Sequence, residues 1–180
     1  GMQFLKAGFG FLALLFGLNA FSAGLGFLLH ELAHKFVAQR YHAWAEFRSD
    51  DRMLLVMLAA SVFGFIFAAP GAVFIHGAID YRRNGHISLA GPLINIILAV
   101  AGLAVSQIPS LGVIGLLAWA TAKINAWLAL FNLLPFGPLD GRKVLAWNRF
   151  VWAGAGLVSL ALVFLTGFAL PAMSALADGV

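Results

Sequence analysis

The chain has 180 residues, of which 62% are hydrophobic and only 10% are charged, with a net charge of +4 and no cysteine. Soluble domains carry about 25% charged residues, so this composition excludes an ordinary soluble domain. It predicts an all-α integral membrane protein, a polytopic helical bundle. The lack of cysteine excludes disulfides and thiolate ligands. The basic residues gather at the ends of apolar runs, which favours membrane topology over nucleic-acid binding as the reason for the positive charge.

The first apolar run covers residues 4–38 and is too long for a single perpendicular crossing. Small and polar residues within 17–26 predict a break, which leaves a short lead-in followed by a helix over about 20–40. Basic residues over 35–52 place the end of this helix on the cytoplasmic side by the positive-inside rule.

This helix carries an H-E-x-x-H motif near its end, formed by residues His30 to His34. The two histidines are four residues apart, so on a helix they lie on one face, one turn apart, and can reach the same zinc ion. Glu31 is placed to act as a general base on the attacking water rather than as a ligand. The alternative is a satisfied polar pair in a core, or a ligand pair for haem or two metals. Ionisable residues are costly in hydrocarbon and persist there mainly for function, which favours the zinc interpretation.

Short strands and an apolar insert are predicted after the first helix. Residues 43–48, 72–79 and 86–89 alternate in polarity or are rich in β-forming residues, and they predict a few strands on the cytoplasmic side. The region 53–79 begins with the apolar stretch 53–69 and lies between two basic clusters, 35–52 and 82–83. It therefore crosses the membrane an even number of times or re-enters it from one side, and the sequence leaves both possibilities open.

Two helices of crossing length are predicted next, over 90–107 and 113–134, joined by a short uncharged turn. A loop with two prolines ends the second helix. Basic residues after this loop mark the cytoplasmic side again, and a last crossing is predicted over about 150–177. We expect residues 2–180 to form a single membrane-embedded domain.

The third metal ligand is expected to be an acid, because catalytic zinc takes three protein ligands and leaves one position for water. Most acids outside the motif lie in charged turns or near the last residue. Asp140 stands apart, since it follows the proline-containing loop at the same membrane depth as His30 and His34. The alternative is an ordinary turn aspartate before Gly141, and the shared depth favours ligation.

Three stretches together resemble the site-2 protease family of intramembrane zinc metalloproteases, peptidase family M50, in its compact form without a PDZ domain. They are His30–His34 (HELAH), Ala90–Asn95 (AGPLIN) and Asn132–Gly141 (NLLPFGPLDG), and they occur in the family's order. Only residues 108–112 join the second and third core helices, where other members insert a PDZ domain. The apolar insert 53–69 is longer than the family leads us to expect.

The resemblance implies a three-helix catalytic core that holds one zinc ion per chain through His30, His34 and Asp140, with Glu31 as general base. It implies that Asn132 helps to bind the substrate or the oxyanion. It also implies a zinc metalloendopeptidase that cuts in or near the transmembrane segment of another membrane protein. The expected partners are such a substrate and the lipid bilayer, without nucleic acid. The expected location is the cell membrane, with the active site toward the cytoplasm, and the oligomeric state stays open.

The main alternative is a non-catalytic membrane metal-binding protein or a metal transporter. A transporter needs several ligand sets along a path, and only one convergent set is visible in the sequence. A peptidase with glutamate as its third ligand is disfavoured because no glutamate follows Glu46. A membrane-segment binding protein without activity is disfavoured by the intact Glu31.

Overall fold

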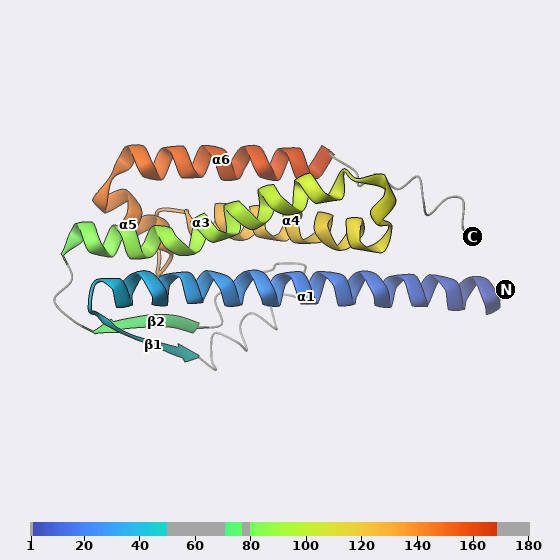
Figure 1. The fold of residues 1–180 in the computed structure, drawn as a ribbon, viewed down its shortest axis with the longest axis horizontal. Coiled ribbons are helices and arrows are strands. Elements are labelled where there is room, and N and C mark those ends of the chain that lie inside the picture. Colours follow the sequence, from blue (N-terminus) through green and yellow to red (C-terminus); the bar gives the residue numbers. More distant parts are fainter. Residues whose placement is uncertain (1, 50–70, 77–79, 169–180) are drawn as a thin grey trace.

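The computed structural model describes residues 2–49, 71–76 and 80–168. The helices are α1 (Met2–Arg40), α3 (Tyr81–Ser106), the short 3-10 helix η1 (Pro109–Leu111), α4 (Val113–Asn132), α5 (Asp140–Trp147) and α6 (Arg149–Phe168). The strands are β1 (Trp44–Ser49) and β2 (Gly71–His76). Figure 1 shows the four long helices along the long axis of the molecule, with α5 at one end and the strands beside α1.

Four helices in the described part of the chain are long and apolar enough to cross a membrane, namely residues 8–40 of α1 together with α3, α4 and α6. Their outer faces carry large exposed apolar side chains, among them Phe16, Leu157 and Phe164. Water would oppose such faces and lipid does not. The prediction of a helical bundle whose long helices are apolar enough to cross a membrane is therefore confirmed for the described residues.

α1 is one helix of 39 residues, so the break predicted within 17–26 is wrong. Gly17 and Gly24 lie on exposed faces, where an added Cβ would meet nothing within 4 Å. Glycine is common in membrane helices, because in lipid no water competes for the backbone hydrogen bonds that glycine would otherwise leave exposed. The helix therefore continues without interruption into the H-E-x-x-H motif.

α3 begins at Tyr81, so the strand predicted over 86–89 is wrong. Asp80 caps the helix, since its Oδ1 accepts a hydrogen bond from the backbone N–H of Arg83 at 2.7 Å. Ile87 is then buried against the C-terminal end of α1. The cap and this packing outweigh the local strand pattern, and the core helix starts earlier than the predicted range of 90–107.

α4 and α6 lie close to the predicted ranges 113–134 and 150–177. Where they meet α3, a buried cluster is formed by apolar residues, namely Ile96, Ala99, Ala126, Ala129 and Leu162. The small residues let the helices approach closely, which is how membrane helices gain packing energy in lipid. Residues after Phe168 lie outside the described part, so the end of the last crossing stays a prediction.

β1 and β2 pair antiparallel along their whole length and contact α1. They overlap the ranges 43–48 and 72–79 in which strands were expected. Residues 50–70 and 77–79 lie outside the described part of the chain, so whether the region 53–79 crosses or re-enters the membrane stays open. The single domain over 2–180 stays a prediction for the same reason.

Candidate metal centre

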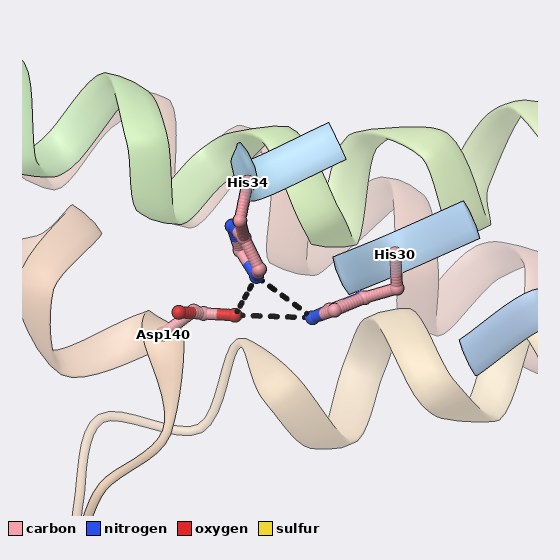
Figure 2. Close-up of side chains that lie close together, drawn as sticks. All are labelled: His30, His34 and Asp140. Atoms are coloured by element: carbon pink, nitrogen blue, oxygen red, sulfur yellow. Dashed lines mark hydrogen bonds and ion pairs between the residues drawn. The ribbon is translucent and has the colours of Figure 1, made fainter. Parts of the chain in front are cut away.

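His30 and His34 of α1 meet Asp140, the first residue of α5 (Figure 2). Nε2 of His30 lies 3.0 Å from Nε2 of His34. Oδ2 of Asp140 lies 3.2 Å from the first nitrogen and 3.0 Å from the second. All three side chains are buried. The fold thus brings together the three residues predicted as ligands, although 110 positions separate His30 from Asp140.

The triangle of donor atoms fits a four-coordinate zinc ion. Zinc lies about 2.0–2.2 Å from nitrogen and oxygen ligands, so a tetrahedral site separates its ligand atoms by about 3.3–3.6 Å. The observed separations of 3.0–3.2 Å are close to this value. His30, His34 and Asp140 would thus supply the three protein ligands that a catalytic zinc ion takes.

The other ring nitrogen of each histidine faces an oxygen. Nδ1 of His34 donates to the backbone carbonyl of Ile87 at 2.7 Å, and Nδ1 of His30 lies 2.5 Å from Oδ1 of Asn95. A carbonyl can only accept, so neutral His34 carries its proton on Nδ1. Its Nε2 therefore presents a lone pair to the cluster, which is the form that binds a metal.

Gly91 of α3 leaves the space that the two histidine rings occupy. A Cβ at this position would lie 2.5 Å from Nε2 of both His30 and His34. Because Cβ atoms do not come so close to other atoms, α3 can pass beside the ligands only where residue 91 has no side chain. The glycine stands within the AGPLIN motif, but no spacing in the sequence indicated this task.

Asp140 is positioned by the loop that follows α4. Gly137 has a φ of +64°, a left-handed conformation that favours glycine. Gly141 lies so close to the carbonyl of Leu133 that a Cβ there would overlap it. The indole N–H of Trp152 donates to the same carbonyl at 2.7 Å. These contacts hold the loop against the end of α4 and fix the place of the carboxylate.

The charge of Asp140 is set by its neighbours. Its second oxygen, Oδ1, lies 3.6 Å from Nζ of Lys143. Burial by itself raises the pKa of Asp140. In the metal-free protein, the positive charge of a protonated His34 ring and hydrogen bonds from His30 and His34 outweigh burial and hold the pKa below its usual range. Asp140 is therefore ionised at neutral pH, as a metal ligand must be.

Glu31 follows His30 on α1 and keeps one oxygen without a protein partner. Its Oε2 is buried, and no described residue donates a hydrogen bond to it. A buried polar atom without a partner is costly and is uncommon in folded proteins. An unpartnered carboxylate oxygen next to a metal centre suits a group that handles a proton during a reaction.

Asn132 ends α4 and stays outside the ligand cluster. Its amide nitrogen donates to the carbonyl of Leu128 at 2.9 Å. Within the described part of the chain it makes no hydrogen bond to His30, His34 or Asp140. Its expected role toward a substrate or an oxyanion stays a prediction.

Comparison with known proteins finds relatives along most of the chain. The chain is 44% identical over 154 residues to "Putative zinc metalloprotease MJ0611" of Methanocaldococcus jannaschii, a match that covers 82% of this chain and 78% of that protein. It is 31% identical over 119 residues to "Zinc metalloprotease MJ0392" of the same organism. It is 30% identical over 133 residues to "Putative zinc metalloprotease Rip3" of Mycobacterium tuberculosis. These two matches cover 66% and 72% of this chain but only 30% of each relative.

No family model matches the chain, and no solved structure shows a significant match. The relative at 44% identity nevertheless covers most of both proteins. By that identity, the chain belongs to the site-2 protease family of zinc metalloproteases.

Proposed function

We propose that the protein is an intramembrane zinc metalloprotease, an endopeptidase that hydrolyses a peptide bond in or near the transmembrane segment of another membrane protein. The main support for this proposal is that His30, His34 and Asp140 converge within a bundle of helices long and apolar enough to cross a membrane. Glu31, with its unpartnered oxygen, lies directly after the first of these ligands. The names of the relatives add zinc and proteolysis to this geometry.

In this proposal His30, His34 and Asp140 hold one zinc ion. When bound, zinc polarises the scissile carbonyl and makes a water nucleophilic near neutral pH. Glu31 takes the proton of the attacking water on its free oxygen and passes it to the leaving amine. The reaction therefore consumes one water for each peptide bond that breaks. Asn132 donates its amide to the substrate backbone or to the developing oxyanion.

The substrate has to be unwound locally, because a transmembrane helix hides its amides in its own hydrogen bonds. An extended segment can bind a sheet edge through its backbone. The β1–β2 pair beside α1 offers such an edge to the unwound segment.

The distribution of charge supports a cytoplasmic position for the site. The end of the bundle that holds the site carries exposed basic residues, namely Lys35, Arg40, Arg82, Arg83, Arg142, Lys143 and Arg149. The opposite turn, over 101–122, has no charged residue. By the positive-inside rule, the basic end lies in the cytoplasm, and in a cell membrane this orientation presents the site to cytoplasmic water.

A metal transporter or a non-catalytic metal-binding protein is the alternative. Transport needs successive ligand sets, and the described residues hold one group of potential metal ligands. Storage or transport also gives no task to the unpartnered oxygen of Glu31. Proteolysis accounts for both the ligands and this oxygen.

The test uses the purified chain in lipid nanodiscs with a mixed pool of synthetic single-span peptides. Mass spectrometry reads the products, and elemental analysis reads zinc. Glu31→Gln keeps the size of the side chain and should retain zinc while cleavage falls about 10²–10⁴-fold. The control Asp80→Asn makes the same acid-to-amide change at an exposed site and should change neither readout. Equal cleavage by Glu31→Gln would remove Glu31 from the mechanism, and zinc binding without cleavage by the wild type would favour the alternative.

A further inference from the structure

A chain of hydrogen bonds runs from His30 into the apolar bundle through two asparagines, Asn95 of α3 and Asn125 of α4, both fully buried. Oδ1 of Asn95 lies 2.5 Å from Nδ1 of His30. Nδ2 of Asn95 donates to Oδ1 of Asn125 at 2.7 Å and to the carbonyl of Gly26 at 3.2 Å. Nδ2 of Asn125 in turn donates to the carbonyl of Thr121 at 2.9 Å. The chain thus links α1, α3 and α4.

Two backbone carbonyls fix which atoms donate and which accept in this series of hydrogen bonds, because a carbonyl can only accept. The amide nitrogen of Asn125 must face the carbonyl of Thr121, so its oxygen faces Asn95. The nitrogen of Asn95 must face the carbonyl of Gly26, and its second hydrogen goes to Asn125. Oδ1 of Asn95 is thereby left to face His30, and it too can only accept. Nδ1 of His30 therefore carries the proton, and Nε2 presents its lone pair to the ligand cluster.

The close packing of α1 against α4 accommodates these hydrogen bonds. A Cβ on Gly26 would overlap the amide oxygen of Asn125. The absence of a side chain at residue 26 therefore lets α1 approach α4 at this level. A buried amide destabilises an apolar core unless each donor and acceptor has a partner. Asn95 has a partner for its oxygen and for both of its hydrogens. One of these partners is the ring of a metal ligand, which points to a task beyond joining helices.

The two histidines differ in what holds their Nδ1 proton. His34 donates to a backbone carbonyl, that of Ile87, which is fixed by the fold of α3. His30 donates to a side chain, that of Asn95. The tautomer and the ring orientation of His30 therefore depend on a residue that mutation can change. Partners of this kind raise metal affinity because they orient the ligand before the metal binds.

We propose that Asn95, held in place by Asn125, is the positioning residue that fixes the tautomer and the ring orientation of His30 for zinc. This inference rests on the proposed zinc site. It gives the two buried asparagines a task beyond linking helices.

The test measures zinc affinity of the full chain in detergent by competition with a chelator, together with the absorption spectrum of the Co²⁺-loaded protein. Asn95→Leu replaces the amide with an apolar side chain of similar branching that cannot accept a hydrogen bond, and it should weaken zinc binding about 10–100-fold and shift the Co²⁺ spectrum. Asn95→Asp keeps an oxygen toward Nδ1 and should bind zinc within a few-fold of wild type. Asn125→Ala removes the support of Asn95 and should give a smaller loss than Asn95→Leu.

The matched control is Ser22→Ala, which removes the partly buried hydrogen bond of 3.0 Å between the hydroxyl groups of Ser22 in α1 and Thr121 in α4. It should leave zinc affinity unchanged. In the metal-free proteins, ¹⁵N NMR of the histidine rings should show the His30 proton on Nδ1 in wild type and Ser22→Ala, and a mixture of tautomers in Asn95→Leu.

Unchanged zinc affinity in Asn95→Leu, alongside lower thermal stability, would reduce Asn95 to a link between helices and overturn the inference. A loss of affinity in Asn95→Asp as large as in Asn95→Leu would also overturn it, because the acceptor would then be irrelevant. If Asn95→Leu does not fold, the other two variants decide: unchanged zinc affinity in Asn125→Ala, or a loss in Asn95→Asp as large as in Asn125→Ala, would overturn the inference. A wild-type chain that binds no zinc would overturn the proposed function as well, whereas the other outcomes concern Asn95 alone.

Discussion

Two buried regions of the bundle have opposite character. Where α3, α4 and α6 meet, the buried residues are apolar, namely Ile96, Ala99, Ala126, Ala129 and Leu162. Around the end of α1 and the start of α5 they are polar, namely His30, His34, Asn95 and Asp140. Each region needs a glycine for close helix approach, Gly102 in the apolar region and Gly91 in the polar one. Close packing thus serves stability in one region and ligand geometry in the other.

The ligand cluster in the polar region favours a proton or a metal ion among its atoms. Hydrogen bonds at the Nδ1 atoms turn both Nε2 lone pairs toward the carboxylate oxygen of Asp140, so three electron-rich atoms converge within 3.2 Å. Such atoms repel one another unless a proton or a metal ion lies among them. Packing in the apolar region needs no such addition. Variants in the two regions should therefore affect different measurements.

Gly91→Ala should damage the polar region most completely. The new Cβ would lie 2.5 Å from Nε2 of His30 and of His34, so the rings have to leave their positions. We expect the purified protein to retain almost no zinc by elemental analysis and to lose cleavage. Gly154→Ala is the control, because a Cβ there meets nothing within 4 Å. A Gly91→Ala protein with full zinc would show that the ligands do not have the described arrangement.

Asp140→Asn should weaken zinc binding by more than about 100-fold, because it removes the one anionic ligand and leaves a poorly coordinating amide. Competition titration measures the change. Asp80→Asn, at an exposed position, controls for the loss of one negative charge. Zinc affinity equal to wild type in Asp140→Asn would refute ligation by Asp140.

Gly102→Ala should affect stability and spare the metal site. The added Cβ would lie 2.5 Å from the carbonyl oxygen of Ala118 and 3.0 Å from the backbone nitrogen of Ala122. Backbone atoms cannot rotate away, so α3 and α4 have to separate. Overpacking of this kind costs about 1–3 kcal/mol in the free energy of unfolding, which thermal denaturation in detergent would show. Loss of zinc affinity at unchanged stability would mean that the two regions are not independent.

The proposed metal ligands could be predicted because they depend on residue spacing within one helix and on which side of the membrane a segment lies. His30 and His34 are related by helical spacing alone, and Asp140 was selected by its membrane depth. Asn95 and Gly91 lie in a motif that was visible, but their tasks were not. Asn95 meets His30 across 65 positions, and such a contact depends on how α1 and α3 pack. The contact of His34 with the backbone carbonyl of Ile87 could not be predicted from the sequence, because every residue has a backbone carbonyl.

Two errors in the predicted helices have physical reasons. The glycines within 17–26 resemble helix breakers of soluble proteins, but α1 continues through them, since Gly17 and Gly24 lie on exposed faces and Gly26 packs against Asn125. The stretch 86–89 resembles a strand in isolation, but it lies inside α3. In both places the environment of the helix outweighed the local pattern.

The smallest expected effect concerns the start of α3. Oδ1 of Asp80 accepts from the backbone N–H of Arg83 at 2.7 Å, and this cap explains why the helix begins at Tyr81. Asp80→Ala should lower the free energy of unfolding by about 1 kcal/mol. Asp80→Asn keeps the cap and should be nearly neutral, because the exposed ion pair with Arg83 at 3.8 Å contributes little. Thermal unfolding of the three proteins side by side measures the difference. If Asp80→Ala proves as stable as wild type, packing of Ile87 against α1 suffices to start the helix, and the cap is not what overrides the strand pattern.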